Sequence, residues 1–393
     1  MWILSGAIAL VAYAYAGYPA LLYLLASRRG ERPAPLPTWE EWPLITLTLP
    51  VHNEARVIAG TLEQILAADY PPEQRQVVVI SDASTDGTDA IVAAFTERGV
   101  ELLRLPVRGG KTAAENAAAA VVRGSIVINT DASVRIHRGA LKALVARFAD
   151  PAVGVASCAD VSVGASARDG NTAESHYVGY EMWVRALETR VAGIVGASGC
   201  LYAIRTELHR KSVPETLSRD FVAALCAWEH GYRAVSVPEA LCFVPRAGSL
   251  RREYRRKVRT MTRGLQTLWY KRSLLNPWRH GLLAWMLASH KLCRWMVPWA
   301  FAASVAAVAA LAVSSLWARA ALGGMALIGV VTAAAFVWEV VAVPRVVGRL
   351  VYPVSGMAAG LHSWVNAFRG AVHPVWEPTR REVDNVPVTM PPA

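Results

Sequence analysis

The chain has 393 residues, 54% of them hydrophobic, and a formal net charge of +11 at pH 7. A mean hydropathy of +0.28 excludes a purely soluble enzyme of ordinary composition, so membrane spans are expected beside one sizeable folded domain. The five cysteines show no Cys-x-x-Cys pairing, which suggests reduced thiols and neither a zinc site nor a disulfide framework.

The first predicted element is a membrane span at Ile3 to Ala26. It is apolar over about the 20 residues that a span needs, and no positively charged segment precedes it. We therefore expect a retained span and not a cleaved signal peptide. A Pro-rich linker follows, from Arg32 to Pro43.

Strand and helix patterns then alternate as far as residue 131. Short apolar runs predict strands, and segments with helical spacing separate them. This order predicts a largely parallel, doubly wound α/β sheet. The expected strands are Leu44 to Val51, Gln76 to Ser81, Val100 to Leu105 and Ile126 to Asp131, and the expected helices are Ala55 to Ala68, Asp86 to Arg98 and Lys111 to Val122.

The alternation continues more loosely and ends in a basic helix. Helices are expected at His137 to Phe148, Thr172 to Val191 and Phe221 to His230, and extended segments at Val153 to Val163 and Cys200 to Ile204. In Arg251 to Arg272, apolar side chains recur on one face of a helix and arginines on another. We expect this helix to lie on the inner leaflet, attracted by anionic lipids.

Further apolar runs follow the basic helix. Trp295 to Trp317 and Ala320 to Val343 predict a tight hairpin of two spans, separated by little more than Arg319. The shorter run Val351 to Phe368 contains a proline and two glycines, and it could span, re-enter or lie on the membrane. We expect four parts: a transmembrane helix at 1–31, an α/β domain at 32–245, a basic interfacial region at 246–294, and a hairpin with a possible third span and a polar tail at 295–393.

Positive charge brackets the α/β domain on both sides. Arg28, Arg29 and Arg32 precede it, and a block of arginines and lysines between Arg246 and Arg279 follows it. By the positive-inside rule we expect a multi-pass protein of the inner (cell) membrane with this domain in the cytoplasm.

Polar side chains gather where the predicted strands end. In an open α/β sheet, ligands collect outside the carboxyl ends of the strands, so these side chains are expected at one edge. Gly109 and Gly110 open a helix at Lys111, which suits a phosphate near a helix N-terminus. Another carboxylate, Asp220, stands at the start of a later helix and could act as a general base.

Eight motifs occur in a set order along the chain. They are Pro50-x-x-Asn53-Glu54, Asp69-Tyr70-Pro71, Ser81-Asp82-x-Ser84-x-Asp86-Gly87-Thr88, Gly110-Lys111 with Asn116, Asp131, Gly196-Ala197-Ser198-Gly199, Asp220-Phe221 with Gly231-Tyr232-Arg233, and Trp376-x-Pro378-Thr379-x-Arg381. Together they resemble the membrane-bound members of glycosyltransferase family 2, inverting enzymes with a GT-A fold that use nucleotide sugars. Cellulose, hyaluronan and poly-N-acetylglucosamine synthases belong to this group. The resemblance covers about Pro19 to Arg381.

The resemblance implies a role for each matching residue. Pro50, Asn53, Glu54, Asp82, Lys111, Asp131 and Arg259 would contact the nucleotide sugar, Asp131 and Ser133 would hold Mg or Mn, and Asp220 would be the catalytic base. The chemistry agrees, since an inverting transfer needs one carboxylate to take the proton of the attacking hydroxyl. A hard divalent cation would offset the charge on the departing diphosphate.

The sequence departs from the family pattern at three places. Ser133 stands where the metal motif has its second acid, and Arg219 stands where an acid often precedes the catalytic Asp. The Gln-x-x-Arg-Trp motif of processive synthases keeps only Arg259. The loss of Gln and Trp from that motif argues against a processive polymerase of the cellulose or hyaluronan kind.

The sequence thus predicts a membrane glycosyltransferase that uses a nucleotide sugar, expected to be UDP-linked, and a lipid-linked or polysaccharide acceptor in cell-envelope or exopolysaccharide synthesis. Its expected partners are membrane lipids and polysaccharide synthesis or export proteins, with no nucleic acid.

Two alternatives belong to other classes. A catalytically impaired relative that binds a nucleotide sugar or scaffolds a synthesis complex would account for Ser133 and Arg219. A Rossmann-type oxidoreductase would need a Gly-x-Gly-x-x-Gly turn after the first strand, where Pro50-Val51-His52-Asn53-Glu54 stands instead.

Overall fold

The computed structural model describes residues 2–28, 39–163, 172–245, 250–337, 345–371 and 375. It separates the chain into two compact units, each described here by itself. The helical unit comprises Met1–Arg29, Ser166–His176 and Ala247–Ala371, and the α/β unit comprises Gly30–Ala165, Tyr177–Arg246 and Val372–Ala393. The predicted closing motif from Trp376 to Arg381 lies outside the described residues.

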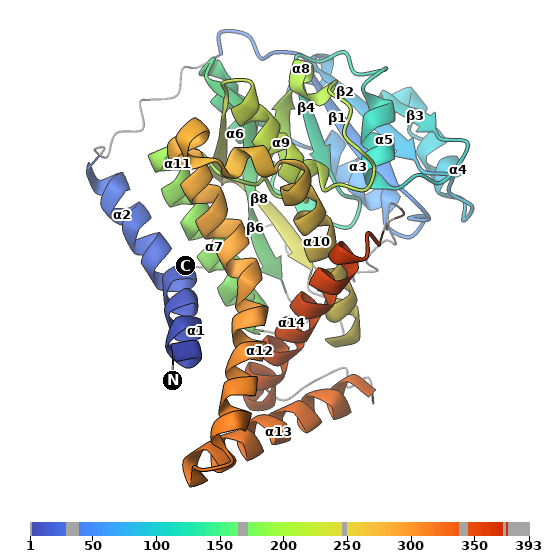
Figure 1. Ribbon diagram of the computed structural model, residues 1–393. Coiled ribbons are helices and arrows are strands. Elements are labelled where there is room, and N and C mark those ends of the chain that lie inside the picture. Colours follow the sequence, from blue (N-terminus) through green and yellow to red (C-terminus); the bar gives the residue numbers. More distant parts are fainter. Residues whose placement is uncertain are drawn as a thin grey trace. The chain divides into compact units, whose positions relative to one another are not determined.

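The α/β unit contains one eight-stranded sheet with the order β3-β2-β1-β4-β7-β6-β8-β5 (Figure 1). The strands are β1 (Ile45–Val51), β2 (Arg75–Ser81), β3 (Val100–Arg104), β4 (Ile126–Thr130), β5 (Arg135–Ile136), β6 (Val153–Val163), β7 (Leu201–Arg205) and β8 (Arg233–Pro245). The helices are α3 (Ile58–Leu66), η2 (Pro72–Gln74), α4 (Thr88–Ala93), η3 (Thr96–Arg98), α5 (Lys111–Ala118), α6 (Ala140–Ala146), η4 (Arg147–Ala149), α8 (Thr206–His209) and α9 (Arg219–Glu229), and α7 (Thr172–Val191) begins in the helical unit.

Alternating side chains of the central strands feed two separate cores, one on each face of the sheet. In β1, Ile45, Leu47 and Leu49 pack with α3 and α6, and in β2 and β4 the alternate residues Val78 and Val127 pack with α5 and α9. Each strand is therefore buried on both faces, as expected of parallel strands covered by helices. This packing accounts for the apolar runs that predict the strands.

The predicted parallel sheet is confirmed for β1 to β4, whereas the sheet as a whole is mixed. β1 pairs in parallel with β2 and β4, β2 with β3, and β6 with β8, but β7 runs antiparallel to both β4 and β6. The sequence analysis also misses β8, in which Pro238 and Glu239 are exposed and a register shift falls opposite Cys158 and Ala159. This irregularity breaks the strand pattern that a sequence can show.

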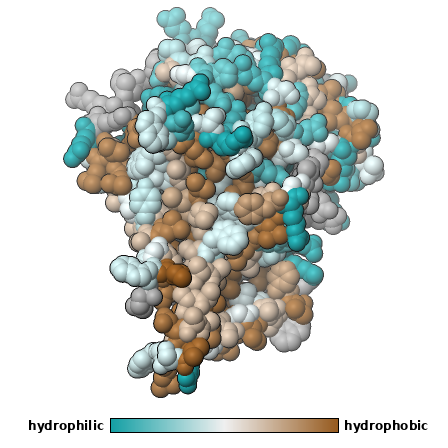
Figure 2. Space-filling model, in the orientation of Figure 1, coloured by the Kyte–Doolittle hydropathy of each residue, from teal (hydrophilic) through white to brown (hydrophobic). Residues whose placement is uncertain are grey.

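The helical unit contains the apolar segments. Its elements are α1 (Trp2–Ala12), η1 (Tyr13–Gly17), α2 (Tyr18–Arg28), α10 (Leu250–Tyr270), η5 (Arg272–Leu275), α11 (Pro277–Leu287), η6 (Ala288–Cys293), α12 (Arg294–Leu311), α13 (Leu316–Val337) and α14 (Arg345–Phe368). Among the described residues, three continuous helices are long and apolar enough to cross a membrane: Trp2–Arg28, Pro277–Leu311 and Leu316–Val337. Large apolar side chains of α12 and α13, such as Phe301, Leu327 and Val330, are exposed. Hydrophobic residues cover much of the surface in the part of the molecule that these two helices form (Figure 2).

The structure corrects the predicted turn of the hairpin. The turn lies at residues 312–315, and Arg319 lies inside α13 with its guanidinium donating to the carbonyls of Ala312 and Val313. The run at Val351 to Phe368 is helical, as part of α14, and its alternative placements at the membrane stay predictions.

The apolar face of the basic helix α10 is covered by protein. Val258 and Leu265 are buried, the Ser363 hydroxyl of α14 donates to the Val258 carbonyl at 3.2 Å, and Gln266 Nε2 donates to the Ala371 carbonyl at 2.8 Å. The predicted amphipathic helix is confirmed, and its apolar stripe packs against α14. Its place on the inner leaflet stays a prediction.

Candidate functional site

The predicted site residues of the α/β unit meet where the strand order changes direction. From β1 the chain passes to β2 and β3 on one side, and then crosses to β4 on the other side of β1. The pairing of β1 with β4 ends at Thr48 and Asn129, whose side chains hydrogen-bond at 2.7 Å. A crevice beyond the carboxyl ends of two such strands is where open α/β sheets bind ligands.

The turn after β1 is tied to the turn after β2. Asn53 has a left-handed backbone (φ 54°), and its Oδ1 accepts a hydrogen bond from the Thr85 backbone at 2.8 Å. The backbone N–H of Glu54 donates to the Thr88 hydroxyl at 2.9 Å. The two predicted nucleotide contacts are thus held in one rigid double turn, and Pro50 lies inside β1 just before it.

Asp82 fixes the turn that precedes α5. Its two carboxylate oxygens accept hydrogen bonds from the backbone N–H groups of Gly109 and Gly110, at 2.7 and 2.8 Å. Gly110 has φ 89°, a left-handed conformation that glycine adopts without steric cost. Asp82 is only 2% exposed in this arrangement, and it sets where α5 begins and therefore where Lys111 stands.

Lys111 connects Asp131, the carboxylate predicted to bind a metal ion, to the rest of the site. Its Nζ lies 2.5 Å from Asp131 Oδ1, 2.8 Å from the Gly199 carbonyl and 4.0 Å from Glu115 Oε1. Burial alone lowers the pKa of Lys111, but the carboxylates of Asp131, Glu115 and Asp220 outweigh it, so the pKa is raised. The ammonium therefore stays charged at neutral pH.

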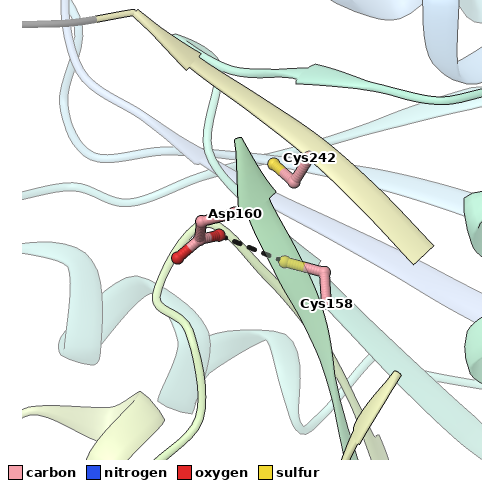
Figure 3. Close-up of side chains that lie close together, drawn as sticks. All are labelled: Cys158, Asp160 and Cys242. Atoms are coloured by element: carbon pink, nitrogen blue, oxygen red, sulfur yellow. Dashed lines mark hydrogen bonds between the residues drawn. The ribbon is translucent and has the colours of Figure 1, made fainter. Parts of the chain in front are cut away.

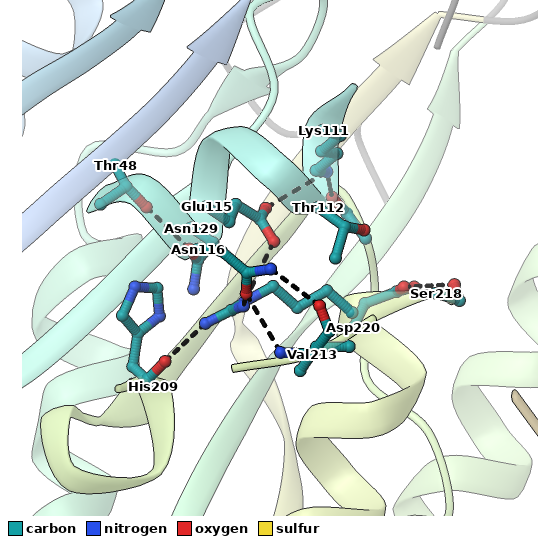
Figure 4. A network of polar contacts seen from close by, with 12 residues as sticks. Thr48, Lys111, Thr112, Glu115, Asn116, Asn129, His209, Val213, Ser218 and Asp220 are labelled. Atoms are coloured by element: carbon teal, nitrogen blue, oxygen red, sulfur yellow. Dashed lines mark hydrogen bonds and ion pairs between the residues drawn. The ribbon is translucent and has the colours of Figure 1, made fainter. Parts of the chain in front are cut away.

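Asp220 is brought to the same place through Gly199. A Cβ added at Gly199 would lie 3.1 Å from Asp220 Oδ2, so the carboxylate packs against the residue whose carbonyl binds Lys111. The Ser218 hydroxyl donates to Asp220 Oδ1 at 2.6 Å at the start of α9 (Figure 4). Two carboxylates that are far apart in the sequence, Asp131 and Asp220, thus share Lys111 as an electrostatic neighbour.

The sequence analysis misses Glu115, which lies one helical turn after Lys111. Its side chain is 0% exposed and points toward the sheet, with Oε2 at 3.5 Å from Arg219 Nε (Figure 4). Burial raises the pKa of Glu115, although Lys111 and Arg219 oppose this. The available signal was an acid at i+4 from Lys111 in an otherwise Ala-rich helix.

Arg219, the unexpected neighbour of Asp220, points away from the crevice. Its guanidinium pairs with Glu115 and also donates to Asn116 Oδ1 and to the His209 carbonyl. The side chain is buried, so it acts as a link between α5 and α9. A positive charge at this position is therefore neutralised inside the fold.

The residues predicted to hold a metal offer hard oxygen donors. Asp131, which directly follows β4, is 20% exposed in its side chain, and Ser133 is buried two residues further on. A carboxylate and a hydroxyl suit Mg2+ or Mn2+, which prefer oxygen ligands, and diphosphate oxygens would complete the coordination. The donor set fits such an ion, with one protein charge.

A second cluster lies on β6 and β8. The ligand atoms of Cys158, Asp160 and Cys242 are within 4.8 Å of one another (Figure 3). Cys158 Sγ lies 3.3 Å from Asp160 Oδ1, and the Ser198 hydroxyl donates to both Asp160 oxygens. Burial raises the pKa of the Cys158 thiol, so the thiol stays protonated and donates to the carboxylate.

Arg259, the last predicted contact, lies on α10 in the helical unit. The other predicted residues belong to the α/β unit, where the crevice gathers Asn53, Glu54, Asp82, Lys111, Asp131, Ser133 and Asp220 around the ends of β1, β2 and β4 and the starts of α5 and α9. The role of Arg259 stays a prediction.

Comparison with known proteins agrees with the fold of the chain. Residues 46–209 match the family model described as Glycosyl transferase family 2. The mannosyltransferase PcManGT from Pyrobaculum calidifontis, solved in complex with GDP-Man and Mn2+, is similar with a TM-score of 0.72 and 26% sequence identity. That similarity covers 94% of this chain and 99% of the mannosyltransferase.

Sequence relatives are similar over shorter stretches. The beta-monoglucosyldiacylglycerol synthase of Synechocystis sp. is 30% identical over 162 residues, which are 39% of this chain and 32% of that protein. An N-acetylglucosaminyltransferase of Mesorhizobium japonicum is 26% identical over 226 residues, which are 52% of each chain. The chain thus spans about a third to a half of the length of these relatives.

Proposed function

The chain belongs to glycosyltransferase family 2 and has a GT-A fold, as its sequence predicts, and on this premise we propose that it is an inverting, metal-dependent membrane glycosyltransferase. It moves a sugar from a nucleotide sugar to a lipid-linked or polysaccharide acceptor. One observation carries this proposal: Lys111 and Gly199 hold Asp131 and Asp220 beside each other at the carboxyl edge of the sheet.

The proposed reaction needs a base and a site for the leaving group. The oxygen of the acceptor hydroxyl attacks the anomeric carbon, and the bond from that carbon to the nucleoside diphosphate breaks. Asp220 accepts the proton that this hydroxyl loses. The Ser218 hydrogen bond holds one carboxylate oxygen, which orients the other. Gly199, without a side chain, allows Asp220 to stand close to the sugar.

Charge compensation for the diphosphate would come from the groups next to Asp220 in the same cluster. A divalent cation held by Asp131 and Ser133 would stabilise the negative charge that develops on the leaving group. Lys111 adds a second, permanent positive charge, and the turn that ends β1 supplies Asn53 and Glu54 for the nucleoside.

The donor is proposed by chemical class. The sequence favours a UDP-linked sugar, whereas the mannosyltransferase from Pyrobaculum calidifontis is bound to GDP-Man. Both are nucleoside diphosphate sugars with the same leaving-group chemistry. The acceptor is proposed to be amphiphilic, because a relative is a diacylglycerol-lipid synthase and this chain carries three candidate spans.

The test compares nucleotide release by wild type and by Asp220→Asn. Purified protein in nanodiscs with membrane lipid extract is given UDP-sugars and GDP-Man with Mg2+, Mn2+ or EDTA. We expect release from one donor that needs metal and falls by on the order of 10²–10⁴-fold in Asp220→Asn, because the base is lost. Binding of the donor should change by less than about threefold.

A matched control is Glu239→Gln, which removes an exposed carboxylate paired with Arg147 at 2.9 Å in the same unit. It should keep the activity of wild type. If Asp220→Asn also kept it, Asp220 would not be the base. If wild type bound a donor without turning any over, the impaired, scaffolding alternative would replace the enzyme.

A further inference from the structure

Lys111 has two carboxylate partners within reach, and they belong to different environments. Its Nζ is 2.5 Å from Asp131 Oδ1 and 4.0 Å from Glu115 Oε1, and its side chain is 19% exposed. Asp131 faces the crevice, whereas Glu115 is fully buried beneath it. The Lys111 ammonium therefore lies between a partly exposed carboxylate and a fully buried one.

Glu115 is poorly satisfied in this arrangement. Neither of its carboxylate oxygens accepts a hydrogen bond from a residue that the structure describes, and its ion-pair contacts are long, 3.5 Å to Arg219 Nε and 4.0 Å to Lys111 Nζ. A buried charge without close partners is costly. A small rotation of the flexible Lys111 side chain would give Glu115 a charged hydrogen bond.

A divalent cation held by Asp131 would bind the same carboxylate that Lys111 contacts now. Two positive charges on one partly buried carboxylate would repel each other. Cation binding to Asp131 and the present Lys111 contact therefore oppose each other.

We propose that Lys111 is an exchangeable counter-ion, which neutralises Asp131 while the cation is absent and turns to Glu115 when a divalent cation binds Asp131. The Gly199 carbonyl, 2.8 Å from Nζ, holds the ammonium in the crevice on the Asp131 side of this exchange. Glu115 is a positioning residue in this scheme, since it acts through Lys111. The inference rests on the proposed metal role of Asp131.

The test is direct titration of Mn2+ by electron paramagnetic resonance, without donor and without turnover. Wild type, Lys111→Met and Glu115→Gln are compared as full-length protein in detergent, with Asp131→Asn to identify the site. Lys111→Met should bind Mn2+ at least about tenfold more tightly, because the competing cation is gone. Glu115→Gln should bind it several-fold more weakly, because Lys111 loses its second partner.

The double variant Lys111→Met/Glu115→Gln separates the exchange from general electrostatics. If Glu115 acts through Lys111, Glu115→Gln has no effect once Lys111 is replaced. A weakening that persists in the Lys111→Met background would overturn the exchange. Lys111→Gln, which keeps a donor for Gly199 without the charge, serves as a second variant should Lys111→Met fold poorly.

The matched control is Lys142→Met, which removes an exposed lysine paired with Asp69 in the same unit and should leave Mn2+ affinity unchanged. Mn2+ binding that Asp131→Asn abolishes but Lys111→Met leaves unchanged or weakens overturns the exchange alone. Absence of any Asp131-dependent binding overturns the metal assignment together with the exchange, whereas the transferase proposal is judged separately by nucleotide release.

Discussion

Two residues of this site, Arg219 and Ser133, depart from the family pattern, and the residues around them show what each departure changes. Arg219 looks incompatible with a catalytic carboxylate next to it, yet its guanidinium turns inward to Glu115, Asn116 and the His209 carbonyl. Ser133 keeps an oxygen donor but no charge, so Asp131 carries the whole proposed protein charge at the metal. The Arg219 departure is explained by contacts that the order of the sequence does not show.

The environment of His209 predicts how the stability of the protein depends on pH. Its ring is 1% exposed, and neither ring nitrogen has a hydrogen-bond partner among the described residues. Burial, assisted by the charge of Arg219, lowers the pKa of His209 from 6.5 to about 3. The folded protein therefore keeps this imidazole neutral, whereas the unfolded chain protonates it below about pH 6.5.

Stability should therefore fall as the pH falls from about 6.5 toward 3, because the unfolded state binds the additional proton. At pH 5.5 the His209 imidazole lowers the free energy of unfolding by about 1 kcal/mol relative to neutral pH. His209→Leu should reduce the drop in thermal midpoint between pH 7.5 and 5.5, measured on the detergent-solubilised protein. His176→Gln, at an exposed position on α7, is the control, and an equal drop in His209→Leu and wild type would contradict the assignment.

At the scale of elements, the site depends on the contact between α5 and α9. Lys111 and Glu115 lie on one face of α5, and Arg219 and Asp220 begin α9. The Asn116 amide adds a clamp: Nδ2 donates to the Val213 carbonyl at 2.7 Å, and Oδ1 accepts from the Val213 backbone at 3.2 Å. The two helices are thus joined by polar groups as well as by the apolar core.

The buried pair of Arg219 and Glu115 should show strong coupling in stability. Arg219→Met leaves a buried carboxylate with one distant cation, so it should destabilise the protein by about 3–5 kcal/mol. Arg219→Met/Glu115→Leu should recover much of that loss, because no buried charge remains. Urea denaturation with intrinsic fluorescence would measure both.

The control for this pair is Arg98→Met, which removes an exposed ion pair with Glu63 and should not shift the midpoint. Additive losses for Arg219→Met and Glu115→Leu would mean that the two side chains do not interact in solution.

At the scale of the whole molecule, the three candidate spans found in the described part of the chain and the bracketing positive charge predict one orientation. With the α/β unit in the cytoplasm, the turn at residues 312–315 lies outside. Ser314→Cys should react with a membrane-impermeant maleimide in intact cells, whereas Ser212→Cys should react only after permeabilisation. Both positions are exposed, and Cys200 and Cys293 would first be replaced by serine. The reverse pattern would place the α/β unit outside.

The sequence by itself determines the type and order of most elements, because strands buried on both faces read as short apolar runs and spans read as long ones. It also places Asp82, Lys111, Asp131 and Asp220 at element boundaries, where ordered motifs identify them. The tertiary structure alone decides the antiparallel strand β7, the strand β8, and the covering of the α10 stripe by α14. It alone brings Glu115 and Arg219 together, since the pairing of buried charges depends on which helices lie side by side on one face of the sheet, and no local pattern encodes that contact.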